Sequence, residues 1–222
     1  LPLTANANIE KTIDSSAKYL IANWINDETL GEYRPPQILP VASGSRIYGA
    51  CGEPIVGHDL GGSAYCSGTH TIYLVPEELQ AFYEAFGANS VTYVVAHEFG
   101  HALQTAFASE LEGPSRELQA DCLAGVFIQT GKAELGITRD GILSMAQAAY
   151  AIGGKTHGTG AQRSYALFSG MGVSKSSCKN AEMIALSKGQ VNDPLLTKLK
   201  GLSKTRSGAK GINTSITPYP KT

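Results

Sequence analysis

The strongest constraint in this sequence is a pair of histidines four residues apart, His97 and His101, inside an apolar segment. Apolar residues recur around them at every third or fourth position, which predicts a buried helix over residues 91–104 with Ser90 as its N-cap. Side chains four apart share one helix face, so both imidazoles can bind the same ion. Glu98 follows the first histidine and can take a proton from a zinc-bound water, whose pKa is about 7. The spacing predicts a hydrolytic zinc site, and its helical context disfavours a chance match.

Two carboxylates four residues apart, Glu117 and Asp121, lie in a second apolar segment that is predicted to be helical over 117–129. Catalytic zinc normally takes three protein ligands, so Glu117 is expected to be the third. Asp121, one turn further on, is expected to accept the free ring N–H of a zinc histidine and so fix its tautomer. A solvated acidic face is the alternative. It fits poorly, because the neighbouring residues are small or apolar and would bury both carboxylates without a partner.

The H-E-x-x-H set followed by E-x-x-x-D resembles the glutamate-ligand zincins, of which thermolysin is the best-known type. More narrowly, the chain resembles the bacterial family of neutral zinc metallopeptidases over about residues 48–180. The phrases that carry this resemblance are YGACG (48–52), AYCSGTHTIYL (64–74), VVAHEFGHALQ (94–104), ELQADCLAGVF (117–127) and HGTGAQR (157–163). The resemblance implies His97, His101 and Glu117 as ligands of one Zn²⁺ and Glu98 as the general base.

The chain departs from the family at Cys66-Ser67-Gly68-Thr69, where members have a C-P-x-D type stretch, and at Gly154, where they have an acidic residue. Both departures lie outside the ligand set, so they bear on substrate preference and on any second ion site. The expected fold is α+β and zincin-like, mostly helical with a small sheet before the active-site helix. The metal is expected between helices 91–104 and 117–129.

The remaining segments are expected to form one catalytic domain over 1–203, followed by an extended tail over 204–222. Helices are predicted over 5–25, 76–86, 140–152, 160–171 and 178–188, and short strands over 37–41, 46–50 and 71–75. The strand 71–75 has two equally good interpretations. It is a plain core strand, or it has an open edge to which an extended substrate peptide adds.

Composition argues against two classes of partner. The 222 residues carry a net charge of −1 and no basic cluster interleaved with aromatic residues, so a nucleic-acid surface is not expected. No apolar run approaches the roughly 20 residues that span a bilayer, so no membrane span is expected in this chain. With 42% hydrophobic and 17% charged residues, the composition is that of an ordinary globular enzyme.

The four cysteines, without any C-x-x-C pair, favour two disulfides over a thiolate metal site. We expect the pairs Cys51–Cys66 and Cys122–Cys178, although four cysteines permit three connectivities and four reduced thiols are a further alternative. Disulfides predict an extracytoplasmic protein, secreted or periplasmic. No signal peptide is visible, and the chain starts at Leu1 without Met, as expected of a product processed from a precursor.

The three other histidines differ in context. His58 and His70 lie in the region of loops and strands and are expected to be surface or locally hydrogen-bonded residues. His157 lies in a glycine-rich loop before a helix, the kind of segment that carries catalytic groups on a rigid scaffold. It is expected to stabilise the tetrahedral oxyanion, with a purely structural loop histidine as the alternative.

These features predict a zinc metalloendopeptidase that acts on a peptide or protein substrate. Glu98 would deprotonate the zinc-bound water and pass the proton to the leaving amine, while the metal and His157 would stabilise the tetrahedral intermediate. Two alternatives remain open. One is a zinc hydrolase of non-protein amides or cell-wall peptide links, and the other is a non-catalytic, zinc-stabilised binding module.

Overall fold

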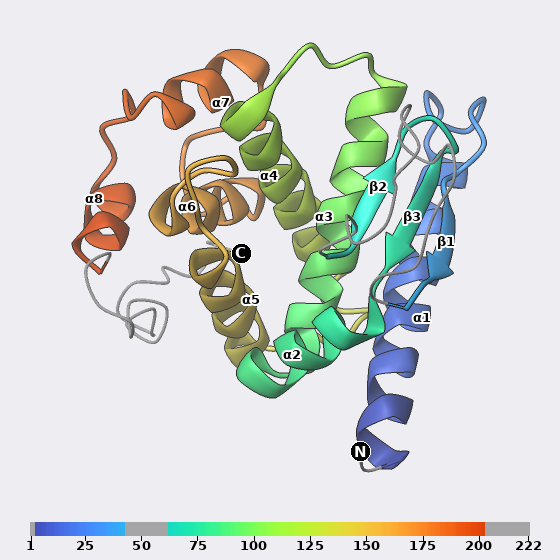
Figure 1. Ribbon diagram of the computed structural model, residues 1–222. Helices are drawn as coiled ribbons and strands as arrows, with labels where there is room; N and C mark the ends of the chain where they lie inside the picture. Colours follow the sequence, from blue (N-terminus) through green and yellow to red (C-terminus); the bar gives the residue numbers. More distant parts are fainter. Residues whose placement is uncertain (1–2, 43–61, 203–222) are drawn as a thin grey trace. The chain divides into compact units, whose positions relative to one another are not determined.

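The computed structural model of the chain describes residues 3–42 and 62–202. Within them the architecture is α+β and mostly helical, with eight helices and one three-stranded sheet (Figure 1). The chain divides into two compact units, Leu1–Ala108 and Ser109–Thr222. The predicted α+β class is confirmed, whereas one catalytic domain over 1–203 stays a prediction. The predicted strand 46–50 and the tail 204–222 lie outside the described residues.

The sheet lies in the first unit and has the order β1-β3-β2. Strand β3 (Thr71–Leu74) pairs in parallel with β1 (Gln37–Pro40) and antiparallel with β2 (Ala64–Cys66). All four residues of β3 are buried, as expected of a central strand. The interpretation of 71–75 as a core strand is therefore confirmed, and the open-edge alternative is wrong, because both edges of β3 are already paired.

The described part of the first unit also contains three helices: α1 (Leu3–Asn26), α2 (Pro76–Phe86) and α3 (Ala88–Ala106). Helix α2 begins with proline and two glutamates, as predicted, and Gly87 ends it with a φ of +85°. Helix α3 follows at once. The predicted N-cap is wrong, because the Ser90 hydroxyl lies inside α3 and donates to the carbonyls of Phe82 and Gly87 instead. Every residue from Ser90 to Gln104 is buried, since α3 packs against α1, α2 and the sheet.

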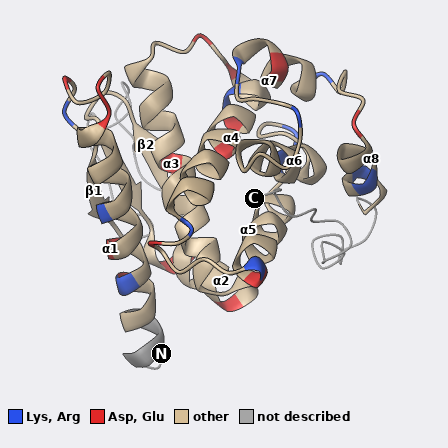
Figure 2. Cartoon of the chain, turned by 180° about the vertical axis from the view of Figure 1, so that it is seen from behind, with Lys and Arg blue, Asp and Glu red and all other residues tan. Residues whose placement is uncertain are grey.

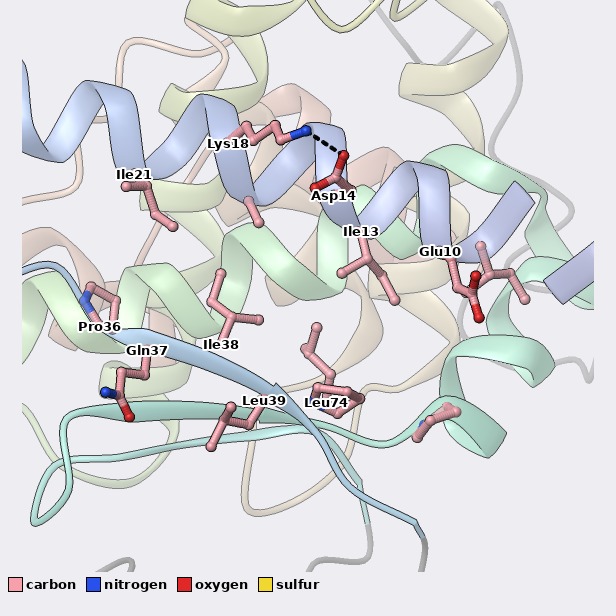
Figure 3. Close-up of a pocket in the computed structure, with 14 residues that line it drawn as sticks. Glu10, Ile13, Asp14, Lys18, Ile21, Pro36, Gln37, Ile38, Leu39 and Leu74 are labelled. Carbon is pink, nitrogen blue, oxygen red and sulfur yellow. Dashed lines mark hydrogen bonds and ion pairs between the residues drawn. The ribbon is translucent and has the colours of Figure 1, made fainter. Parts of the chain in front are cut away.

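Helix α1 buries Leu20 and Trp24, and the Trp24 indole N–H donates to the Tyr33 carbonyl at 2.9 Å. Beside these buried residues, Ile13 and Ile21 line a groove of about 850 Å³ between α1 and β1 (Figure 3). The other lining residues come mainly from α1 and β1, and none of the predicted catalytic residues lines this groove.

The described part of the second unit is helical: α4 (Gly113–Gly131), α5 (Arg139–Ala151), α6 (Gly160–Gly170), α7 (Asn180–Ser187) and α8 (Pro194–Gly201). Local capping explains where several of them begin. The Thr159 hydroxyl and the Gln162 side chain form a reciprocal capping box at α6, and the Asp193 carboxylate accepts from the Leu195 N–H at α8. Helices 140–152, 160–171 and 178–188 are confirmed to within two residues at each end, whereas α8 was not predicted.

Helices α4 and α6 form the centre of the second unit, and two glycines allow their close approach. A Cβ at Gly125 would collide with the Leu167 carbonyl oxygen, and one at Gly170 with that of Cys122. Cys122 also forms the predicted disulfide with Cys178, with a Cα–Cα distance of 5.6 Å. This bond ties α4 to the segment before α7.

The first predicted disulfide is described only in part. Cys66, at the end of β2, is fully buried and disulfide-bonded. Its predicted partner Cys51 lies outside the described residues, as does His58. Figure 2 shows basic and acidic positions along α1, where Asp14 and Lys18 form an exposed ion pair at 2.7 Å. Among the described helices, none combines the length and apolar character that crossing a bilayer requires.

Candidate metal centre

Helix α3 holds His97 and His101 on one face, as their four-residue spacing predicts. The two rings lie edge to face, with centroids 4.8 Å apart and planes at 85° to each other. Both residues are buried, with 7% and 9% of their surfaces exposed. The helix therefore brings two imidazoles close together in an apolar setting.

The tautomer of His101 follows from its neighbour Gln104. The Nδ1 atom of His101 lies 2.8 Å from Oε1 of Gln104, an oxygen that can only accept. The proton of the neutral ring therefore sits on Nδ1, and the lone pair that a metal needs is on Nε2. Such a hydrogen bond at the opposite ring nitrogen is the usual way in which proteins orient a histidine ligand.

Glu98 lies on the same helix, next to His97, and is 6% exposed. The main-chain N–H of Tyr65, in β2, donates to Oε2 of Glu98 at 2.7 Å. This charge-assisted bond fixes the orientation of a buried carboxylate, and it links the sheet to the predicted general base. No motif in the sequence indicated the role of Tyr65, because a main-chain donor has no signature of its own.

Glu117 lies in the first half of α4 and keeps 18% of its side chain exposed. Oε2 of Glu117 lies 4.0 Å from Nε2 of His157, which is too far for a hydrogen bond. The loop that carries His157 is closed by an isolated bridge between Gly154 and Gly158, and Thr156 accepts or donates at Nδ1 of the ring at 2.7 Å. The predicted oxyanion role of His157 stays a prediction.

Asp121 forms a buried ion pair with Arg163 in the second unit. Nε and a terminal nitrogen of Arg163 donate to its two oxygens at 2.7 and 2.9 Å. The Arg163 side chain is 4% exposed and that of Asp121 is fully buried. The predicted hydrogen bond from a zinc histidine to Asp121 stays a prediction. Sequence reasoning missed Arg163, which ends the phrase at 157–163 but is 42 residues from its partner.

His97, His101 and Glu117 form a group that could hold a metal ion. Their potential ligand atoms, two imidazole nitrogens and a carboxylate oxygen, all lie within 4.8 Å of one another. Two histidines and one carboxylate are a donor set that zinc uses in hydrolytic sites. Two residues that the sequence analysis did not assign orient predicted site residues: Gln104 orients His101, and Tyr65 orients Glu98. Of these, only Gln104 had a usable signal, because it lies three residues after His101 on one helix face.

Comparisons of this chain with protein-family models, with curated proteins and with solved structures gave no match. The membership of a metallopeptidase family therefore stays a prediction from the sequence phrases. The structure shows only that His97, His101 and Glu117 lie close enough together to hold a metal ion.

Proposed function

We propose that this chain is a zinc-dependent metallopeptidase of the glutamate-ligand zincin type, with a zincin-like fold. Two observations together carry the proposal. His97, His101 and Glu117 form a group that could hold a metal ion. Glu98, next to His97 in the sequence, is a buried carboxylate that the Tyr65 N–H orients. A purely structural metal site needs no such carboxylate. A hydrolytic one does, because water must lose a proton as it attacks.

The residues fit zinc by the chemistry of their donors. Nitrogen and oxygen ligands suit this ion, and three protein ligands leave one position for water or substrate. The Nδ1–H of His101 is directed at Gln104, which leaves a lone pair on Nε2 for coordination. Zinc held there would supply Lewis-acid activation of a water molecule and of the substrate carbonyl. No sulfur ligand is expected, since Cys66, Cys122 and Cys178 are all disulfide-bonded.

The chain's own groups would then handle the protons. Glu98 would accept a proton from the attacking water and deliver it to the leaving amine. The Tyr65 N–H would hold its carboxylate in one orientation during both transfers. His157 would donate from its ring to the developing oxyanion, and its 4.0 Å separation from Glu117 supports a place near the ligand group.

The Cys122–Cys178 disulfide supports an extracytoplasmic location, because such bonds persist in oxidising compartments. A peptide or protein outside the cytosol is accordingly the proposed substrate.

Metal analysis and an unbiased peptide library test the proposal together. Purified protein should contain one zinc per chain and cleave peptides, and a chelator should abolish cleavage. His97→Ala and Glu117→Ala should lose the metal. Glu98→Gln should keep the metal and lose cleavage, since Glu98 moves protons and coordinates nothing. Full activity of Glu98→Gln would refute the mechanism.

The same assay separates the two alternatives. A hydrolase of cell-wall peptide links would cleave cross-linked peptides in preference to casein. A non-catalytic binding module would retain its function in Glu98→Gln and show no chelator-sensitive cleavage of any peptide.

A further inference from the structure

His70 joins two segments of the first unit through its ring. It lies at the end of the turn between β2 and β3, where its φ is +50°. Its Nε2 is 2.7 Å from the carbonyl oxygen of Arg34, and its Nδ1 is 2.8 Å from the hydroxyl of Tyr65. A carbonyl oxygen can only accept, so Nε2 carries the proton. In the neutral ring Nδ1 is then an acceptor, and the Tyr65 hydroxyl donates to it.

The surroundings of His70 hold its ring in this orientation. The ring lies edge to face with that of Tyr65, at a centroid distance of 5.8 Å, and 5.8 Å from the ring of Trp24. Trp24 is buried and in turn contacts Phe99 of α3, the residue after Glu98. The main chain is also tied down, because the Gln37 N–H donates to the His70 carbonyl. A positive φ is uncommon for residues other than glycine, and these contacts hold His70 in that conformation.

Strand β2 needs such support because it is short and lies at the edge of the sheet. It has three residues, and within the described ranges 3–42 and 62–202 it pairs only with β3. Its central residue, Tyr65, directs its main-chain N–H to Glu98 at 2.7 Å. Any shift of β2 along or away from β3 would therefore move the donor that orients the predicted general base.

We propose that His70 is a positioning residue for Glu98, acting through the side chain of Tyr65. The two hydrogen bonds of the imidazole act as a clamp that joins the Arg34 carbonyl to the Tyr65 side chain, and this clamp keeps the Tyr65 N–H on the Glu98 carboxylate. This inference rests on the proposed function, since it assigns Glu98 the proton-transfer role. His70 itself touches neither the predicted ligands nor Glu98 in any contact that the structure describes.

Tyr65→Phe tests the clamp with the smallest change, because it removes the hydroxyl and leaves the main-chain N–H in place. In the zinc-loaded protein we expect kcat to fall roughly fivefold, the effect of losing one hydrogen bond, with KM unchanged. Tyr73→Phe is the matched control. Tyr73 lies opposite Ala64 in the same sheet, and its hydroxyl contacts Thr69 at 3.4 Å rather than His70. This control should keep the kcat of the unchanged protein.

His70→Asn tests the clamp from the other side. Asparagine tolerates a positive φ, but its side chain is too short to reach both Arg34 and Tyr65. It should lower kcat at least as much as Tyr65→Phe, and the double variant should be no slower than His70→Asn alone, because both remove the same hydrogen bond. If the losses in kcat of the two single variants add up in the double variant, His70 and Tyr65 do not act through the same hydrogen bond, and the proposal is overturned.

Hydrogen exchange at the Tyr65 amide provides a readout that does not depend on activity. In the metal-free protein, His70→Asn should speed this exchange severalfold, as Glu98→Ala should by removing the acceptor. The Tyr73→Phe control should not.

The experiments distinguish a wrong function from a wrong role for His70. If the unchanged protein shows no chelator-sensitive cleavage, the proposed function is wrong, and the amide exchange still decides whether His70 positions β2. If the protein is active but Tyr65→Phe keeps its kcat, or changes only KM or the melting temperature, the positioning role is overturned. Unchanged Tyr65 exchange in His70→Asn would overturn it as well.

Discussion

Replacement of Arg163 by methionine is expected to be one of the most destabilising single changes in the second unit. The guanidinium makes two hydrogen bonds to Asp121, at 2.7 and 2.9 Å, and the two side chains are 4% and 0% exposed. Removal of one partner from a buried pair typically costs about 3–5 kcal/mol, because the remaining charge has lost both water and its counter-ion. Methionine keeps much of the apolar volume, so little of this loss would come from a cavity.

Lys18→Met is the matched control. Lys18 and Asp14 also approach to 2.7 Å, but their side chains are 75% and 62% exposed. Such an exposed pair within one helix contributes only about 0.3–0.5 kcal/mol. The two variants therefore differ in burial and not in distance. Arg163→Lys should fall between them, since it keeps the charge and loses the paired geometry.

Urea titration of the metal-free protein measures the free energy of unfolding without a contribution from bound zinc. The slope of the titration should stay constant while the midpoint falls in Arg163→Met. A loss below about 1 kcal/mol would show that Asp121 does not depend on this guanidinium, and the account of a buried ion pair in α4 and α6 would be refuted.

Three further predictions concern other contacts. Replacement of Cys122 and Cys178 together by alanine should lower the free energy of unfolding by about 4 kcal/mol, because the bond closes a loop across a sequence separation of 56 residues; equal stability with and without reductant would contradict this. Burial raises the pKa of Glu182, but hydrogen bonds from Ser177 outweigh it, so the pKa is lowered. Stability from Glu182 should be present above its unfolded pKa of about 4.3 and disappear as the pH falls through its folded pKa, so Glu182→Gln should be less stable at pH 7 and equally stable in strong acid. His157→Ala should keep its zinc, and its kcat should fall by a factor of about 10²–10³. Loss of zinc in this variant would mean that His157 supports the ligand Glu117 instead.

The elements that could be predicted from the sequence are those that depend on local signals. Helix α3 was predicted because apolar periodicity and the His97–His101 spacing agree with each other. Helix α8 was missed although Asp193 and Pro194 are a good N-cap and first residue, since eight residues give too little periodicity to stand out. The central position of β3 could not be predicted, because pairing on both sides depends on segments distant in the chain.

The same distinction holds within the candidate site. The donor residues His97, His101 and Glu117 are identified by spacing and chemistry, and their grouping is a result of the structure. The contacts that orient the site join residues far apart in sequence. Tyr65 and Glu98 are 33 residues apart, and Arg163 and Asp121 are 42 apart. Hydrogen bonds of this kind depend on tertiary packing, so residue type alone gives no indication of them.

The contact between α4 and α6 leads to a final prediction. Gly170, the last residue of α6, lies against the main chain of α4, and a Cβ there would collide with the carbonyl oxygen of Cys122. Main-chain atoms cannot rotate aside as a flexible side chain can, so Gly170→Ala must push the two helices apart. Overpacking of this kind costs about 1–3 kcal/mol, whereas the gain in helix propensity is at most about 1 kcal/mol in a helix interior and smaller at the last residue of α6.

Gly201→Ala separates these two effects. Gly201 is also the last residue of its helix, α8, but nothing lies within 4 Å of the position of its Cβ. Alanine there should stabilise the chain by about 0.4–1 kcal/mol, whereas Gly170→Ala should destabilise it. Because α4 carries Glu117, its displacement in Gly170→Ala should also weaken zinc binding in a competition titration with a chelator. If both variants gain stability, the close approach at Gly170 does not constrain α4, and the position of Glu117 must depend on other contacts.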